Sequence, residues 1–252
     1  MAAKAAPRQR LDRLVVERGL APTREQAQAL ILAGAIRVGG LPAAKPGHAV
    51  PADAEITLVA SPPPYASRAG AKLAAALDAF AIPVAGRVAL DVGSSTGGFT
   101  DCLLQRGARR VHAVDAGTNQ MVWRLRTDPR VHLLENTNAR YLRARDLGAG
   151  EAPGLLTVDV SFISVTLLLP ALVPLLAPGA DAVILVKPQF ECGRAAVGKG
   201  GIVRDAAARQ AAVERVAAAV RAAGGECRGA LPSPVLGARG NQEWLLAARF
   251  PA

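Results

Sequence analysis

The sequence is poor in cysteine, histidine and aromatic residues. Its 252 residues include only Cys102, Cys192 and Cys227, without a CxxC pair, and three histidines. An odd number of scattered cysteines cannot form a disulfide framework, and the few histidines do not complete a thiolate zinc site. The composition therefore excludes a disulfide-stabilised secreted domain and predicts a metal-free protein of a reducing cytoplasm.

A secretory signal and an uninterrupted membrane span are also missing. The first residues, MAAKAAPRQRLDRL, contain no apolar stretch followed by a small-residue cleavage site. Residues 160–180 are uncharged and long enough for a membrane helix, but Pro170, Pro174 and Pro178 interrupt them. We interpret this segment as a loop followed by a buried helix, and we expect no membrane association.

Lysine is scarce although positive charge is abundant. The chain carries 30 Lys and Arg against 20 Asp and Glu, and only five of the 30 are lysines. A net charge of +10 is typical of a protein that binds a polyanion, and nucleic acid is the first candidate. Because arginine is the default cation here, each remaining lysine is a candidate for a role that arginine cannot fill.

The chain has enough apolar residues for a substantial core beside a smaller module. Apolar residues make up 51% of the sequence. The string SPPP, which begins at Ser61, suits neither a helix nor the interior of a sheet. It predicts a linker over residues 61–66, between a small unit at 8–60 and a larger one at 67–252.

The small unit combines helix and strand patterns. Leu11, Leu14 and Leu20 recur at helical spacing, and Thr23 with Gln26 forms a helix N-cap signature. Short strands are expected at 36–38 and 54–59. The pattern therefore predicts a small α+β unit.

The larger unit alternates apolar strands with helices. Because this alternation is typical of a parallel sheet covered on both faces, we predict a doubly wound, mostly parallel α/β fold. The predicted strands are 88–91, 111–115, 131–134, 155–159 and 182–186.

A glycine-rich loop, DVGSSTGGF, follows the first of these strands at residues 91–99. Its GxxxGG spacing differs from the GxGxxG of dinucleotide sites. Asp115, at the end of the next strand, is placed to accept hydrogen bonds from ribose hydroxyls. A glycine turn with Asp115 as a capping acid would explain either half alone, whereas the combination favours S-adenosylmethionine. The candidate cofactor contacts are Asp91, Gly93, Ser94, Ser95, Gly97, Gly98, Phe99, Asp115 and Asp159.

The segment RLDRLVVERGLAPTREQAQALILAGAIRVGG, residues 10–40, resembles the alpha-L RNA-binding domain of ribosomal proteins. The resemblance implies that a basic face contacts RNA phosphates, which provide affinity rather than sequence choice. The alternative is a basic face that is simply solvated. The candidate RNA contacts are Arg10, Arg13, Arg18, Arg24, Arg37 and, beyond this unit, Arg68.

Four motifs in order, DVGSSTGGFTD, DVSFIS, VKPQFECGRAAVGKGGIVRD and SPVLGARGNQEW, make nearly the whole chain similar to the TlyA family. Members of this family, also labelled hemolysin A, are ribosomal RNA 2′-O-methyltransferases with an FtsJ/RrmJ-like catalytic half. The resemblance implies a Rossmann-like class I methyltransferase fold. It also implies cytidine ribose as the substrate and ribosomal RNA or ribosomal subunits as partners.

The family's catalytic set falls on Lys72, Asp159, Lys187 and Glu243, two of which are among the rare lysines. An alcohol is a poor nucleophile until its proton leaves, and we expect Lys187 to be the general base, because arginine cannot give up its proton. A neighbouring ammonium and partial burial would favour its neutral amine. We expect Lys72 and Glu243 to orient the hydroxyl, while Asp159 fixes Lys187 and faces the methionine end of the cofactor.

Two other functions remain open at this point. One is a non-catalytic RNA-binding or ribosome-assembly factor, and the other, more distant, is a pore-forming hemolysin. His48, His112 and His132 are interpreted as structural, since none lies in a ligand-like cluster. Asn138 and Arg140 are candidates for contacts with either adenine or RNA.

Overall fold

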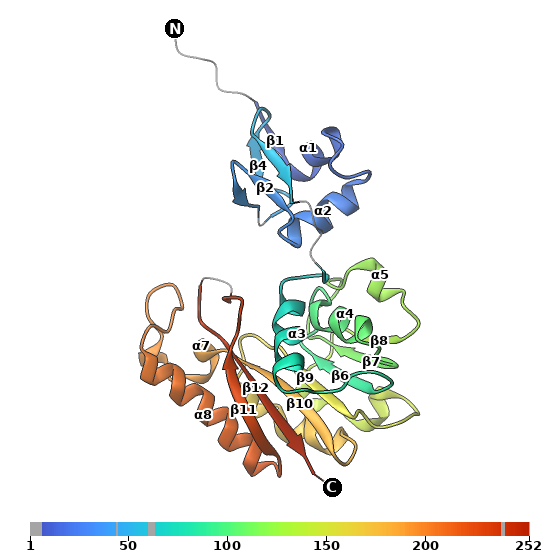
Figure 1. Ribbon diagram of the computed structural model, residues 1–252, viewed down its shortest axis with the longest axis vertical. Helices are drawn as coiled ribbons and strands as arrows, with labels where there is room; N and C mark the ends of the chain where they lie inside the picture. Colours follow the sequence, from blue (N-terminus) through green and yellow to red (C-terminus); the bar gives the residue numbers. More distant parts are fainter. Residues whose placement is uncertain (1–6, 44, 60–63, 238–239, 252) are drawn as a thin grey trace. The chain divides into compact units, whose positions relative to one another are not determined.

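The computed structural model describes residues 7–43, 45–59, 64–237 and 240–251, and the chain divides into two compact units (Figure 1). One unit is Met1–Arg68 and the other is Ala69–Ala252. Residues 61–63 of the predicted linker lie outside the described residues, so its extent stays a prediction.

The N-terminal unit packs two helices on small antiparallel sheets. Thr23 caps the second helix by accepting a hydrogen bond from the backbone N–H of Gln26, at 3.2 Å, as the sequence predicts. The strand predicted at 54–59 is shorter, because only Ile56–Leu58 pairs with Ile36–Val38. Its elements are β1 (Arg8–Arg10), α1 (Leu11–Glu17), α2 (Arg24–Leu32), β2 (Ile36–Val38), β3 (Leu41–Pro42), β4 (Ala49–Pro51) and β5 (Ile56–Leu58).

The second unit is built on a seven-stranded, mostly parallel sheet, which confirms the predicted fold class. The strand order is β11-β12-β10-β9-β6-β7-β8. Strands β6 to β10 run parallel, whereas β12 is antiparallel to both β10 and β11. The strands are β6 (Val88–Val92), β7 (Arg110–Val114), β8 (Val131–Leu134), β9 (Leu155–Val158), β10 (Ala180–Val186), β11 (Glu226–Pro232) and β12 (Trp244–Phe250).

Helices cover both faces of this sheet. Val213, Val216 and Val220 of α8 share one apolar core with Leu90 and the other strand residues of that face. Neighbouring strand residues alternate between faces, so Asp91 points to the opposite face, where it contacts α4. The longer helices of the unit are α3 (Ala69–Ala79), α4 (Gly98–Gln105) and α8 (Ala206–Ala222).

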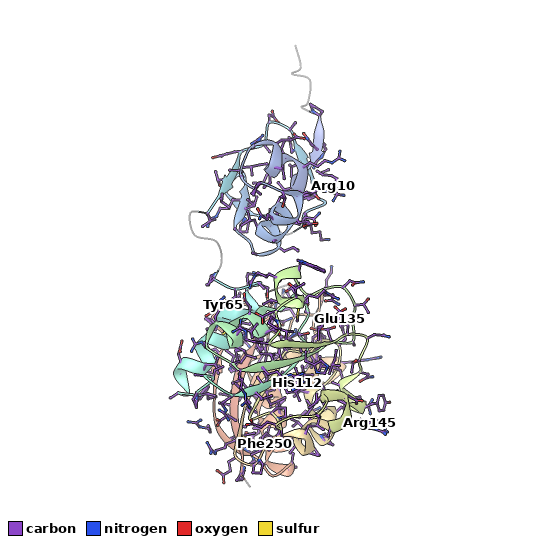
Figure 2. All side chains as sticks on the ribbon, turned by 90° about the vertical axis from the view of Figure 1, so that its right-hand side faces the viewer. Arg10, Tyr65, His112, Glu135, Arg145 and Phe250 are labelled. Atoms are coloured by element: carbon purple, nitrogen blue, oxygen red, sulfur yellow. The ribbon has the colours of Figure 1, made fainter. Side chains whose placement is uncertain are left out.

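Several short helices lie between the strands. In Figure 2 the side chain of Arg145, on one of them, projects outward from the unit. These elements are α5 (Trp123–Arg126), η1 (Ala139–Tyr141), η2 (Ala144–Leu147), η3 (Val165–Leu167), α6 (Leu169–Leu172), η4 (Val173–Leu175), α7 (Pro188–Glu191) and η5 (Arg194–Ala196).

The uncharged segment 160–180 begins with the predicted loop, but its helical part is divided and is not the single buried helix that we expected. It forms a loop and then η3, α6 and η4, because Pro170 and Pro174 each occupy the first turn of a new helical segment. Leu168, Leu169 and Leu172 lie in the core. No helix in the described part of the chain is long and apolar enough to cross a membrane.

Candidate active site

The predicted site residues gather at the carboxyl edge of the sheet. Asp115 follows β7, Asp159 follows β9 and Lys187 follows β10, and these strands belong to the parallel part of the sheet. The antiparallel strand β12 begins at the same edge, because Trp244 pairs with Val186. Lys187 and Glu243 therefore occupy adjacent positions beside this last pair.

A cavity of about 520 Å³ opens at this edge, between the ends of β6, β7 and β9. Of the predicted cofactor contacts, Gly93, Ser95, Asp115 and Asp159 line it. Asn138, whose role the sequence left open, lines it too, whereas Arg140 does not. The cavity wall does not include Asp91, Ser94, Gly97, Gly98 and Phe99.

Two glycines of the loop are required by their surroundings. Gly93 has φ +85°, and a Cβ there would collide with the carbonyl oxygen of Asp159. Gly97 has φ +95°, and a Cβ there would collide with the side chain of Leu125. Both φ values are strained for residues that carry a side chain. At Gly93 the loop also lies closer to the Asp159 backbone than a Cβ atom would allow.

Asp91 acts behind the cavity rather than in it. Its fully buried carboxylate accepts hydrogen bonds from the hydroxyls of Thr100, at 2.6 Å, and Thr157, at 2.9 Å. Burial raises the pKa of Asp91 to about 6, although both hydroxyls oppose the shift. Asp91 therefore ties β6 to α4 and β9, and so supports the loop that leaves β6.

Asp115 already accepts two backbone hydrogen bonds. One carboxylate oxygen accepts from the N–H of Ser95 and the other from the N–H of Gly117, each at 2.7 Å. Each carboxylate oxygen can accept more than one hydrogen bond, so room remains for ribose hydroxyls. The two existing bonds fix the direction in which Asp115 faces the cavity.

Lys187 is held by two oxygen atoms. Its Nζ lies 2.7 Å from Oδ1 of Asp159 and donates to Oγ of Ser161 at 2.9 Å. The side chains of Lys187 and Asp159 are 12% and 16% exposed, so the pair is largely shielded yet reachable from the cavity that Asp159 lines. Ser161 was not predicted as a site residue, although it lies in the quoted motif DVSFIS.

Lys72 and Glu243 form the second lysine–carboxylate pair. Lys72 Nζ lies 2.5 Å from Glu243 Oε2, and the side chains are 10% and 3% exposed. Lys72 comes from the first turn of α3, and a Cβ on Gly237 would collide with the carboxylate of Glu243. The four predicted catalytic residues thus form two ion pairs. The pairing of β10 with β12 brings Lys187 of one pair beside Glu243 of the other.

A second carboxylate near Lys187 was missed by sequence reasoning. Glu191, at the end of α7, is buried and accepts hydrogen bonds from Ser164 Oγ at 2.5 Å and from the N–H of Val165 at 2.8 Å. Burial raises the pKa of Glu191. It ties the turn after Lys187 to the loop after Asp159, where Phe162 has φ +67° and is 92% exposed. The one sequence feature that could have identified Glu191 as a site residue is its position in the motif VKPQFE.

The arginines of the N-terminal unit are partly organised by Asp12, which was also not predicted. This buried carboxylate accepts hydrogen bonds from Arg10 and Arg24 and from the amide of Gln28, at 2.9 to 3.0 Å. Its pKa lies well below the usual range, chiefly because Arg10 donates to it.

The other predicted RNA contacts are arranged differently. Arg18 donates to the carbonyls of Ala52 and Ala54, each at 2.6 Å. Arg13, Arg37 and Arg68 are exposed. All three therefore remain accessible to a polyanion, while Arg18 also anchors the loop between β4 and β5.

Comparisons with known proteins divide the chain in a similar way. An FtsJ-like methyltransferase family model matches residues 65–250, and an S4 domain model matches residues 9–56. The chain is 48% identical over 245 residues to the Mycobacterium tuberculosis 16S/23S rRNA (cytidine-2′-O)-methyltransferase TlyA. The match covers 97% of this chain and 91% of that protein.

Two further relatives match over most of their length. A Bacillus subtilis protein, YqxC, provisionally named an rRNA methyltransferase, is 47% identical over 97% of this chain and 86% of its own length. A solved structure from Streptococcus thermophilus, provisionally named a hemolysin, is 42% identical. It covers 98% of this chain and 90% of its own, with a TM-score of 0.76.

Proposed function

The chain belongs to the TlyA-type branch of the FtsJ-like methyltransferase family, and from this premise we propose that it methylates ribose 2′-hydroxyls of ribosomal RNA, at cytidine. The observation that carries the proposal is the Lys187–Asp159 pair, placed beside a cavity at the carboxyl edge of the sheet. Ligands of open α/β sheets bind at this edge. With ribosomal RNA as the substrate, we expect the protein to act in the cytoplasm.

The lysine amine is arranged to take a proton. In its ion pair with Asp159 the group is an ammonium, which must release one proton to solvent before it can act as a base; the neutral amine that remains has two N–H donors and one lone pair. The two contacts of Lys187, to Asp159 and Ser161, account for both donors. The lone pair is then left for the 2′-hydroxyl proton, so that the ribose oxygen becomes nucleophilic as that proton leaves. Arginine at this position would keep its proton and could only donate.

The second pair has a different role. Lys72 and Glu243 are more deeply buried than Lys187 and Asp159 and hold each other at 2.5 Å. We assign to them the orientation of the ribose hydroxyl and the placing of a fixed positive charge near Lys187, since Lys187 and Glu243 flank one strand pair. Glu191 acts behind the site by holding the loop that carries Asp159 and Ser161.

The cavity fits S-adenosylmethionine in size and in the chemistry of its lining. Its volume of about 520 Å³ falls within the range of about 300–1,000 Å³ of small-molecule sites. We assign Asp115 to the ribose hydroxyls, Asn138 and apolar Ile163 to the adenine, and Asp159 to the methionine end, because all four line the cavity. When bound there, S-adenosylmethionine supplies the electrophilic methyl group.

The test is methyl transfer to ribosomal subunits purified from a strain that lacks 2′-O-methylation. We expect the wild-type protein to transfer labelled methyl groups to ribose and Lys187→Ala to bind the subunits without transferring them. Mapping the modified nucleotides identifies the base. A wild-type protein that binds the subunits and the cofactor but never transfers methyl groups would be the non-catalytic RNA-binding factor instead.

Asp115 provides a separate test of the cofactor site. Asp115→Ala removes the carboxylate and leaves the N–H groups of Ser95 and Gly117 without it. We expect S-adenosylmethionine affinity to fall by about 1–3 kcal/mol, the cost of leaving polar groups unpaired. Calorimetry measures this, with Asp78→Ala, at an exposed ion pair with Arg106, as the control. Equal affinity in both variants would remove Asp115 from the site.

A further inference from the structure

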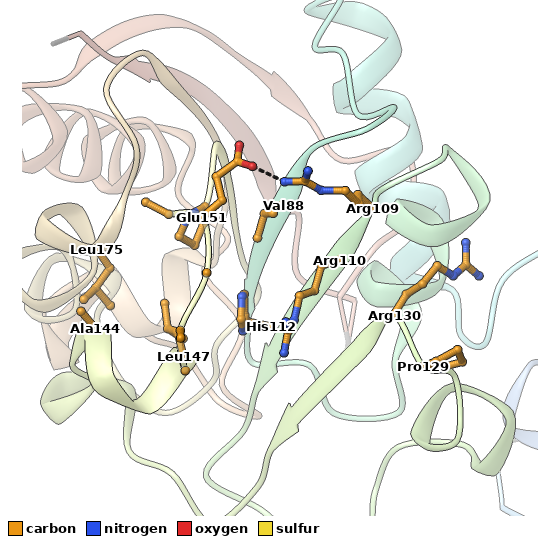
Figure 3. A pocket seen from close by; sticks show the side chains of 15 residues that line it. Val88, Arg109, Arg110, His112, Pro129, Arg130, Ala144, Leu147, Glu151 and Leu175 are labelled. Carbon is orange, nitrogen blue, oxygen red and sulfur yellow. Dashed lines mark hydrogen bonds and ion pairs between the residues drawn. The ribbon is translucent and has the colours of Figure 1, made fainter.

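A second cavity, of about 550 Å³, lies at the edge of the sheet opposite the candidate active site (Figure 3). Its wall is formed where strands begin: Val88 is the first residue of β6, Arg110 is the first of β7, and Arg130 directly precedes β8. The segment 147–153, rich in glycine and alanine, forms another part of the wall. Nothing in the proposed methyl transfer uses this cavity.

The charged groups that line the cavity are three arginines and one acid. Arg109 is paired with Glu151, and Arg130 is paired with Asp128 at 2.8 Å (Figure 3 draws the first pair). Within the described residues, the Arg110 guanidinium takes part in no hydrogen bond or ion pair. One exposed guanidinium is therefore left without a counter-charge at the cavity wall.

Two imidazoles lie next to this guanidinium. His112 and His132 are register partners on β7 and β8, and their Nδ1 atoms are 3.0 Å apart. Such a contact requires one Nδ1 to carry a hydrogen and the other to be bare. Burial lowers the pKa of His112 to about 4, and burial followed by the charge of Arg110 lowers that of His132. The pair is therefore neutral near pH 7.

A cation would face a wall of net positive charge, because the one lining acid, Glu151, is already paired with Arg109, and an apolar ligand would cover an unpaired guanidinium. Arginine recognises phosphate with several parallel hydrogen bonds, and one unbalanced guanidinium matches the single charge of a phosphodiester. The volume exceeds what a phosphate group needs, so a nucleoside can accompany it. We propose that this cavity is a second ligand site, which binds the phosphate group of a nucleotide, either free or within an RNA strand.

The two histidines make this site measurable. A phosphate bound beside Arg110 stabilises the imidazolium forms, so the pKa of His112 or His132 should rise by about one unit. The chain has three histidines, and His48 belongs to the other unit and serves as the internal control for the small ligands, but not for RNA, which that unit is proposed to bind. Imidazole NMR titrations of the full chain are recorded with cytidine monophosphate, with inorganic phosphate and with chloride at equal ionic strength.

Arg110→Gln is the decisive variant, because the exposed side chain can be changed without disturbing the core. Without ligand, it should raise the pKa of His132, since a repelling charge is removed. With ligand, it should abolish the further rise. Arg221→Gln, at an exposed ion pair with Glu214 on α8, is the matched control and should respond like the wild type.

A short RNA without terminal phosphates separates the two sources of the ligand. If the RNA raises the histidine pKa and cytidine monophosphate does not, the site binds the RNA backbone; the reverse result assigns it to a free nucleotide. No rise with any of these compounds, or an equal rise in Arg110→Gln, would overturn the proposal. The readout needs no methyl transfer, so it is independent of the proposed activity.

Discussion

The N-terminal unit and the carboxyl edge of the sheet both bury carboxylates, but the groups that partner these carboxylates differ. In the N-terminal unit, Asp12 is surrounded by the guanidinium groups of Arg10 and Arg24, whose side chains are 47% and 49% exposed. The carboxylate stays charged, and the two arginines are held at the surface. Because arginine keeps its proton, this arrangement can bind anions and cannot move protons.

Near this edge the partners are lysines or hydroxyls, whereas Asp181 and Asp101, elsewhere in the sheet unit, pair with arginines. Asp159 and Glu243 each pair with a lysine at the carboxyl edge. Asp91 accepts hydrogen bonds from two threonine hydroxyls and faces no cationic partner among the described residues, and its pKa is raised to about 6 rather than lowered. The comparison indicates that arginine serves where a fixed charge suffices, whereas the one proton that has to move is assigned to a lysine, Lys187.

The largest effect should come from exchanging the two kinds of cation. Lys187→Arg keeps the charge beside Asp159 but removes the group that can accept a proton. We expect methyl transfer to fall by about 10⁴-fold, the upper range for general-base catalysis, which corresponds to roughly 5.5 kcal/mol. Single-turnover methylation of ribosomal subunits from pH 7 to pH 10 measures it.

Lys72→Arg is the matched control for this prediction. It places a guanidinium in the more buried pair with Glu243, where we assign an orienting role. The fall in methyl transfer should be smaller for Lys72→Arg than for Lys187→Arg, and cofactor affinity should be unchanged in both variants. If Lys187→Arg transfers methyl groups at a rate near that of the wild type, Lys187 positions the substrate and another group accepts the proton.

The second largest effect concerns the stability of the N-terminal unit. Asp12→Ala leaves Arg10 and Arg24 without their common carboxylate and the amide of Gln28 without its acceptor. Breaking a buried ion pair costs about 3–5 kcal/mol, and the half-exposed arginines place this one near 3 kcal/mol. Denaturant unfolding monitored by hydrogen exchange in residues 7–59 tests this, with Glu17→Ala as an exposed control.

Much of this contrast could be predicted from the sequence. The ends of strands follow from local apolar patterns, and the scarcity of lysine follows from the composition. The predicted strands place Asp115, Asp159 and Lys187 at one edge, since parallel strands share their carboxyl ends. The structure confirms those strands. The ion pair between Lys72 and Glu243 could not be predicted. These residues are 171 positions apart and meet only because α3 packs on the sheet.

Other features depend on burial, which a single sequence does not reveal. Asp91 and Asp115 both end strands in similar contexts, yet one lies behind the loop and the other lines the cavity. Nothing in the letters of the sequence separates an acid that contacts two hydroxyls from one that accepts two backbone N–H groups. Glu191 and Asp12 were missed for the same reason.

A pH titration should separate the two units. Asp91 has a pKa of about 6 in the fold against about 3.9 when unfolded, so its stabilising contribution is present below pH 4 and is lost as pH rises through 6. Asp91 should therefore remove roughly 2 kcal/mol from the stability of the sheet unit between pH 4.5 and 6.5, whereas the lowered pKa of His112 contributes in the opposite direction over the same range. The contribution of Asp12 to stability changes with pH in the direction opposite to that of Asp91. Because its pKa is lowered, that contribution is present above pH 4 and is lost on acidification.

Residue-resolved hydrogen exchange of the full chain follows both units at once. Asp91→Asn removes this ionisation, so the difference in stability of the sheet unit between wild type and variant should change by roughly 2 kcal/mol between pH 4.5 and 6.5, with residues 7–59 unchanged. If this difference stays constant over the range, the pKa of Asp91 is not raised by its burial.

The smallest effect sharpens the comparison within the N-terminal unit itself. Arg24 bonds Asp12 through its Nε alone, and within residues 7–59 as described its two Nη groups have no hydrogen-bond partner. Arg18, by contrast, uses both Nη groups on the carbonyls of Ala52 and Ala54. Arg24 is therefore better placed than Arg18 to contact a phosphate.

Losing one phosphate contact lowers the slope of log affinity against log salt by about 0.7 for single-stranded RNA. We expect Arg24→Gln to lose this amount in RNA binding at several salt concentrations, while Arg18→Gln keeps the wild-type slope and mainly lowers stability. Equal slopes for the wild type and Arg24→Gln would mean that Asp12 holds Arg24 for the fold rather than for RNA.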